Sequence, residues 1–217
     1  IRHLSGIGSR VAGYPGCDSA AAFVEADFRA MGLERVRREQ FPITVPMDKG
    51  GRLRVGEEEI QIYGLWPNLV RTPTVPPEGV TAPMIYGANG DWTDFDGQEV
   101  EGRIVLMEFN SEDRWLHAGA LGARAVVFIA PETSTWLQAN DKYVGTPLDL
   151  PRYWIDRSDG AALRGQLQQR EIPVTLFGRM DWEQRPAWNI LGEIEGADIE
   201  LRDELVVVHA YYDGISV

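Results

Sequence analysis

The chain has 217 residues, 44% hydrophobic and 25% charged, a balance typical of a folded globular protein and not of a disordered or collagen-like one. Lys and Arg number 21 against 33 Asp and Glu, so the formal net charge is −12, which argues against a nucleic-acid partner. The single cysteine, Cys17, permits no internal disulfide, and no apolar run approaches the roughly 20 residues of a membrane-spanning helix.

The first 45 residues predict a turn, a helix and a strand. The glycine-rich stretch 6–16 is interpreted as a turn, because it lacks the preceding strand and the Lys-Ser/Thr ending of a phosphate loop. Asp18 or Ser19 is the candidate cap of a helix with apolar residues at helical spacing, and Gly32 is the expected stop. Residues 34–45 then alternate as a strand, which we expect Pro46 to close.

A β-rich block is predicted from Leu53 to about Phe177, with helices around 114–121 and 159–169. The stretch 71–83 contains four prolines and is interpreted as a linker or an edge. The block's strand candidates are short runs bounded by Gly and Pro: 60–63, 84–87, 104–109, 126–129 and 174–177.

Further strands are predicted at 190–194 and at the apolar run Leu205–Val208. The second run is typical of a strand buried on both faces of a parallel sheet, which needs neighbours at both edges. Because no further sequence supplies them, we expect a fragment of a longer protein.

The order of these segments favours an α/β fold class in which a β-rich domain is inserted into a loop. The expected divisions are 1–52 for the first part of the α/β domain, 53–182 for the insert and 183–217 for the first sheet strands of the α/β domain, which is truncated.

Four stretches, in this order, resemble M28-type zinc aminopeptidases that carry an inserted protease-associated (PA) domain. They are Leu4–Arg10 with the helix that ends at Met31-Gly32-Leu33, Gly102–Leu106 with Leu121–Ile129, Asn189–Gly196, and Glu204–Asp213. The resemblance covers essentially the whole chain. It implies the opening part of a zinc-exopeptidase α/β domain with a β-rich PA insert.

The resemblance also implies that the terminal segment delivers the first residues of a metal site. In the family, a histidine ligand is followed two residues later by an aspartate, and this aspartate orients the histidine ring. Aligned on Asp213, the ligand position is Tyr211, a departure from the family pattern, since a phenol is a weaker zinc ligand than imidazole. His209 lies two residues farther away, about 6–7 Å along a strand.

The remaining family ligands would follow Val217. We therefore expect zinc in the full-length parent if it is active, no cofactor in this chain, and a peptide or protein as substrate or partner. The family also suggests an extracytoplasmic or secreted protein. The alternative function is a non-catalytic peptide- or protein-binding module from a degenerate M28-like protein, which the seven tryptophans favour.

Three features have simpler interpretations. His209 is favoured as a hydrogen-bonded core histidine over a metal ligand. The aspartates at 91, 94 and 96 have the spacing of a calcium loop, but Gly102 stands where the distal Glu is required, which favours a turn. The run Glu57-Glu58-Glu59 is typical of a solvated face.

Overall fold

The computed structural model describes residues 2–68, 70–143, 146–201 and 203–214. The chain divides into two compact units, residues 1–45 with 182–217, and residues 46–181. Two strands of 22 residues each, β1 (Glu34–Val55) and β7 (Ile172–Glu193), carry the chain between the two units.

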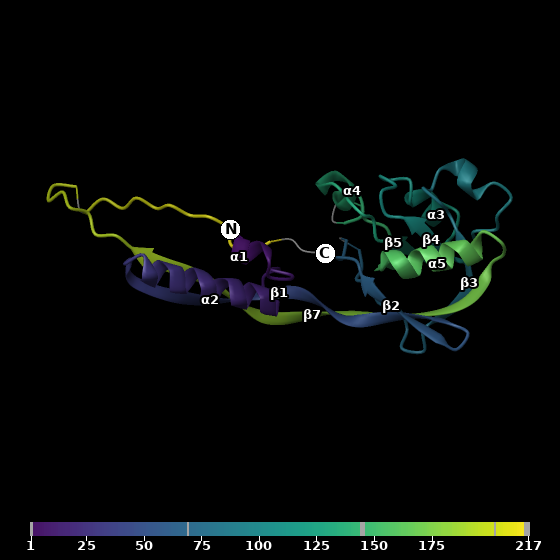
Figure 1. The fold of residues 1–217 in the computed structure, drawn as a ribbon, viewed down its shortest axis with the longest axis horizontal. Helices are drawn as coiled ribbons and strands as arrows, with labels where there is room; N and C mark the ends of the chain where they lie inside the picture. The colour runs from purple at the N-terminus through teal and green to yellow at the C-terminus, as the bar shows by residue number, and fades with distance from the viewer. Residues whose placement is uncertain (1, 69, 144–145, 202, 215–217) are drawn as a thin grey trace. The chain divides into compact units, whose positions relative to one another are not determined.

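The first unit contains α1 (Arg2–Ser5) and α2 (Pro15–Ala30), and α2 lies along the first part of β1 and the last part of β7 (Figure 1). Pro15 occupies the first helical position, where its missing N–H removes no hydrogen bond. Gly16 is required by a close approach, since a Cβ there would overlap the Ser9 carbonyl oxygen. Gly32 follows the helix at φ +81°, which confirms it as the stop.

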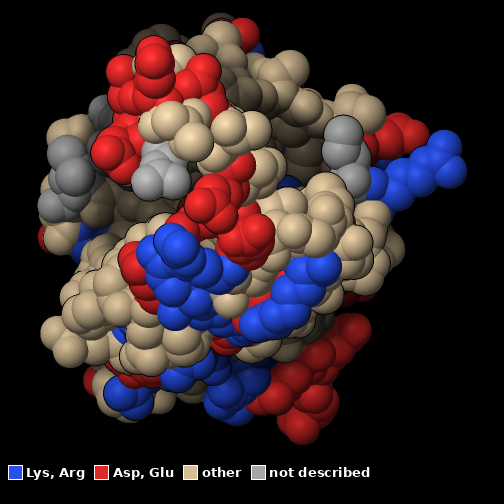
Figure 2. Space-filling view, turned by 90° about the vertical axis from the view of Figure 1, so that its left-hand side faces the viewer, with Lys and Arg blue, Asp and Glu red and all other residues tan. Residues whose placement is uncertain are grey.

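Ion pairs connect the elements of the first unit. The Arg35 and Arg37 guanidinium groups each donate to the Glu193 carboxylate at 2.8 Å, and Arg38 pairs with Glu25 of α2. Figure 2 shows basic side chains gathered beside acidic ones on the face that it presents. Most of these pairs are solvent-exposed, so water and salt screen the attraction between their charges.

The second unit is a closed barrel with the strand order β1-β2-β6-β5-β4-β3-β7. Strands β3, β4, β5 and β6 pair in parallel with one another, whereas β2 pairs antiparallel with β1 and β6, and β7 pairs antiparallel with β3. The bounds are Glu58–Gly64 for β2, Val80–Tyr86 for β3, Ile104–Glu108 for β4, Ala125–Ile129 for β5 and Arg152–Ile155 for β6.

Helical segments of the second unit follow its parallel strands. They are the 3₁₀ helix η1 (Trp92–Phe95), α3 (Leu116–Ala120), α4 (Trp136–Asn140) and α5 (Arg157–Leu167). One buried cluster joins the barrel strands to Leu163 and Leu167 of α5, and a second joins β3, β4 and β5 to Trp115 and Ala118 at α3. The α5 helix packs against β3 and β5.

The prediction that Pro46 closes the first strand is wrong, because β1 continues to Val55. Its second half pairs with β2, from Gly51 opposite Ile62 to Val55 opposite Glu58. Within this strand Gly50 has a φ of +90°, a conformation that glycine adopts without the strain that other residues would have. The candidates 174–177 and 190–194 are likewise one strand, β7.

The interpretation of 71–83 as a linker or an edge is wrong from Val80 onward, since β3 begins there, includes Pro83 and lies between β4 and β7. Pro83 lies opposite Pro173 of β7, and pairing with β4 begins only at Met84. Neither proline has an N–H to donate, so this opposed pair forms no backbone hydrogen bond between β3 and β7.

Two cationic side chains lie in the core of the second unit, Lys142 and Arg152. Lys142 Nζ donates to the Glu112 carbonyl at 2.8 Å and to the Gln138 carbonyl at 3.2 Å, and lies 5.1 Å from the Phe109 ring centroid. Arg152 donates to the Lys142 carbonyl. Burial lowers the pKa of Lys142 to about 8 and that of Arg152 to about 10.

Replacing Leu106 by Ala tests the core of the second unit. Leu106 is fully buried on β4, so we expect the free energy of unfolding to fall by about 2–5 kcal/mol. Leu137→Ala is the matched control, because Leu137 is 63% exposed in the same unit and the expected change is within about 0.5 kcal/mol. Urea unfolding followed by circular dichroism measures both, and equal losses would contradict this packing.

Because Lys142 is buried and its pKa is lowered, we expect the stability of the chain to depend on pH. Its pKa is about 8 in the folded chain and near the ordinary 10.5 after unfolding, so between these values the unfolded chain binds more protons. Stability therefore rises with pH in this window, by about 1.5 kcal/mol between about pH 8 and 9.5. Urea titrations of the Lys142→Met variant should not show this rise. If the free energy of unfolding changed with pH in the same way in both proteins, Lys142 would not be its cause.

Candidate functional site

The predicted strand at Leu205–Val208 is wrong. Residues 205–214 form neither helix nor strand, and Leu205 and Val208 are 87% and 92% exposed. A strand of this composition needs hydrogen-bonded neighbours, and within the described residues no strand pairs with it. The predicted metal residues His209, Tyr211 and Asp213 lie on this irregular segment, which belongs to the first unit.

Arg10 holds the end of this segment. Its carbonyl oxygen accepts a hydrogen bond from the Gly214 N–H at 3.1 Å, and its Nη1 donates to the Tyr212 carbonyl oxygen at 2.7 Å. Tyr212 lies 202 positions away in sequence. Arg10 therefore fixes the backbone on both sides of Asp213.

A second set of hydrogen bonds anchors the Tyr212 side chain. The Tyr212 hydroxyl donates to the Trp188 carbonyl oxygen at 2.6 Å, and Trp188 Nε1 donates to Asp18 Oδ1 of α2 at 3.1 Å. Tyr212 is half-buried, whereas the neighbouring Tyr211 is 89% exposed. Of the two tyrosines, Tyr212 is thus the structural anchor.

Cys17 lies buried on α2 beside Tyr212. Burial is the main reason that the pKa of the Cys17 thiol is raised, and the Tyr212 hydroxyl partly opposes it, while the charge of Asp213 adds to it. Burial also raises the pKa of Tyr212, with contributions from Cys17 and Asp213. Both groups keep their protons at neutral pH, so Cys17 is not an activated nucleophile.

The three predicted metal residues, His209, Tyr211 and Asp213, are all exposed, so the interpretation of His209 as a core histidine is wrong. Among the described residues, no three His, Cys, Asp or Glu side chains are placed so that they could hold a metal ion. Catalytic zinc takes three protein ligands, so the described residues do not fit a complete zinc site.

Asp91 and Asp94 cap the short 3₁₀ helix η1. The Asp94 carboxylate accepts from the Asn89 and Asp91 N–H groups, and Asp91 and Asp94 form a reciprocal capping box at η1. This agrees with the turn interpretation. Glu59 is paired with Arg52 at 3.1 Å and with Arg54 at 3.0 Å on the exposed face of β1 and β2.

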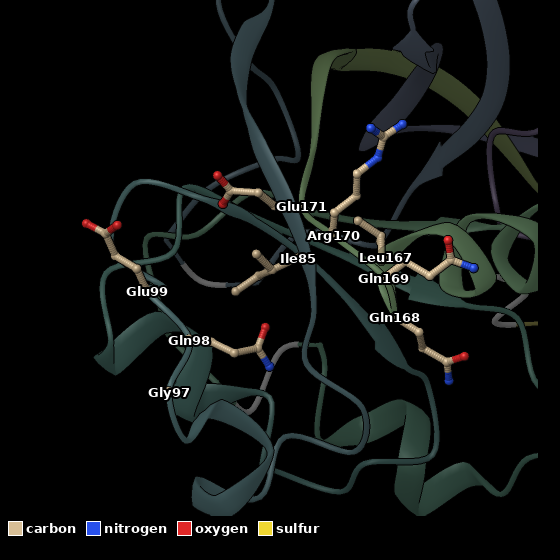
Figure 3. A pocket seen from close by; sticks show the side chains of 9 residues that line it. All are labelled: Ile85, Gly97, Gln98, Glu99, Leu167, Gln168, Gln169, Arg170 and Glu171. Carbon is tan, nitrogen blue, oxygen red and sulfur yellow. The ribbon is translucent and has the colours of Figure 1, made fainter.

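A shallow hollow of about 310 Å³ lies in the second unit between the turn after η1 and the end of α5 (Figure 3). Its apolar floor is formed by Ile85 and Leu167, and its rim is polar. Glu99 and Glu171 at the rim are both paired with Arg103, at 2.7 and 3.4 Å. The rim acids are thus already paired within the unit, and the residues that line the hollow form no catalytic arrangement of side chains.

Residues 71–163 match the PA domain family. Among curated protein sequences, none matches the chain. In the described residues, no helix has the length and the apolar character needed to cross a membrane.

The solved structures that are similar to the chain include three peptidases. BSAP, a zinc aminopeptidase from Bacillus subtilis, is 22% identical with a TM-score of 0.58, over 87% of this chain and 44% of BSAP. The aminopeptidase from Aneurinibacillus sp. strain AM-1 is 20% identical with a TM-score of 0.51, over 92% and 47%. The peptidase M28 precursor from Shewanella amazonensis SB2B is 14% identical with a TM-score of 0.58, over 90% and 49%.

The chain therefore spans about half the length of these structures and shares their fold over most of its own length. The resemblance to M28-type aminopeptidases with a PA domain is confirmed, as is the α/β fold class. Over the aligned residues the chain therefore has the fold of these solved peptidase structures, and residues 71–163 match a PA domain.

Tyr212→Phe tests the anchor of the terminal segment. The variant loses the hydrogen bond to the Trp188 carbonyl, so we expect the first unit to lose about 1 kcal/mol of stability and residues 209–214 to exchange amide protons faster. Tyr211→Phe is the matched control and should change neither quantity, since Tyr211 is 89% exposed. Mass-spectrometric hydrogen exchange measures the effect, and identical exchange in both variants would contradict the anchor.

Proposed function

We propose that this chain is the N-terminal portion of an M28-type metallopeptidase-like protein whose full-length form hydrolyses peptides. The observation that carries the proposal is the shared fold over 87–92% of the chain, together with the PA domain match at 71–163. The proposed divisions are 1–52, 53–182 and 183–217, with the PA domain as the middle part.

His209, Tyr211 and Asp213 form the proposed family-equivalent metal region of the parent. Arg10 supports this assignment, since it holds the backbone at Tyr212 and Gly214 and so fixes the position of Asp213. Zinc is the proposed cofactor of the parent. The proposed compartment is extracytoplasmic, by analogy with the precursor peptidase from Shewanella amazonensis.

Hydrolysis of aminoacyl p-nitroanilides by the full-length protein tests this function. We expect turnover that a chelator removes and zinc restores, and a fall of about 10- to 100-fold in activity or zinc affinity for Asp213→Asn, the position that orients a ligand in the family. Glu58→Gln is the control, because Glu58 is an exposed residue of β2 in the second unit, outside the proposed metal region.

Chelator-resistant turnover, or a folded full-length protein without turnover, would overturn the catalytic proposal. The second outcome would favour the alternative, a non-catalytic peptide-binding module. Tyr211 at the ligand position and the exposed tryptophans of the second unit are the observations that favour this alternative.

A further inference from the structure

Three loops of the second unit meet at one edge of its barrel. Strands β3, β4 and β5 are parallel, so the segments that follow them, 87–96, 109–117 and 130–141, leave from the same edge. We call these three segments the carboxyl edge. The carboxyl ends of parallel strands are the common position for binding surfaces in α/β proteins, because loops are free to vary there.

The carboxyl edge exposes large apolar side chains. Trp136 and Leu137 of α4 are 64% and 63% exposed, and Trp92 of η1 is 55% exposed. Tryptophan is usually well buried in a folded protein. Exposed tryptophans are also the residues that contribute most when a partner covers them.

These side chains stand on a rigid base. The Trp92 ring stacks on His117 with centroids 3.9 Å apart, and His117 Nδ1 lies 2.7 Å from the Gly90 carbonyl oxygen. On α4, the Gln138 side chain accepts from the Glu112 N–H at 2.8 Å, and Lys142 holds the carbonyls of both residues. A partner would therefore bind without a large cost of ordering the loops.

The two tryptophan sites belong to one surface. Arg114 lies between them, with Nη1 3.6 Å from the Asp91 carboxylate beside η1 and Nη2 3.8 Å from the Glu112 carboxylate. Glu112 in turn contacts Gln138 of α4. A continuous path of contacts thus runs from the helix of Trp92 to the helix of Trp136.

The charge of the carboxyl edge is acidic. Arg114 is the one Lys or Arg within the described residues of these segments, and its charge is offset by Asp91 and Glu112. The acidic side chains of the three segments are Asp91, Asp94, Asp96, Glu112, Asp113, Glu132 and Asp141. Glu132 is paired with Arg157 of α5 at 3.1 Å, and the net charge of the edge remains negative. A cation is attracted to such a surface by the charge of the carboxylates and also by the faces of the exposed indole rings.

We propose that the carboxyl edge binds peptide segments that carry Lys or Arg next to an apolar residue. The apolar residue packs on Trp136 and Leu137, and the cationic side chains lie over the indole rings and among the carboxylates. This inference deepens the proposed peptide function by naming a substrate or partner class, and it rests on that function only for its biological role.

The test titrates the chain with a short fluorescent peptide of Lys, Leu, Gly and Ser, and with its counterpart in which every Lys is Glu. We expect fluorescence anisotropy to report binding of the Lys peptide alone. Its affinity should fall about tenfold or more when the salt concentration rises from about 0.05 to 0.5 M, since salt screens exposed charges. Equal binding of both peptides, or no binding at millimolar concentration, would overturn the proposal.

Matched variants locate the surface. Trp136→Ala should weaken the Lys peptide about tenfold, as expected for a central aromatic contact, and the double variant Glu112→Gln, Glu132→Gln should reduce the salt dependence. Trp182→Ala removes a tryptophan that is 56% exposed in the first unit, and Glu58→Gln removes an exposed carboxylate of β2. Both controls should bind normally, and a loss in Trp182→Ala equal to that in Trp136→Ala would refute the assigned surface.

This test separates the two proposals, because binding is measured on this chain and hydrolysis on the full-length protein. Selective binding with no hydrolysis by the parent would leave the carboxyl edge assigned and overturn catalysis. If the full-length protein hydrolysed peptides but this chain did not bind the Lys peptide selectively, the catalytic proposal would stand and the carboxyl-edge proposal would be overturned.

Discussion

Closure of the barrel is the constraint on which the second unit depends. An open sheet of seven strands would leave two rows of unpaired N–H and C=O groups, and β7 beside β1 removes both edges. The same two strands carry the chain into and out of the first unit. Since β1 and β7 are neighbours in the barrel, the chain enters and leaves the second unit on adjacent strands. The two ends of the second unit are therefore close together, so the entropic cost of closing the loop that contains it is small.

The local elements were predictable where sequence-local signals determine them. The helix that ends at Gly32 and the buried runs of β4 and β5 follow from periodicity and turn residues. Local signals failed for β1, because pairing with β2 outweighs Pro46 and the glycines at 50 and 51. They failed in the opposite direction at Leu205–Val208, where strand propensity is high and no described strand supplies hydrogen bonds.

The candidate site was predictable only in part. Spacing and family resemblance singled out His209, Tyr211 and Asp213, but the contacts that hold this segment come from Arg10, about 200 positions earlier in sequence. Nothing in the sequence indicates that Arg10 contacts Tyr212, or that α2 places its cysteine beside that tyrosine. Likewise, only exposure distinguishes the tryptophan of α4 at position 136 from the fully buried one at position 115. Such long-range and burial information exists only in the folded chain.

The exposed run Leu205–Val208 has a consequence for the behaviour of the chain in solution. Four consecutive apolar residues, three of them β-branched, form a segment that readily pairs with the same segment of another copy. At neutral pH the net charge of −12 keeps copies apart through mutual repulsion. That repulsion disappears as the pH approaches the isoelectric point near 4.7. Copies of the isolated chain should therefore associate more readily through this segment as the pH falls toward the isoelectric point.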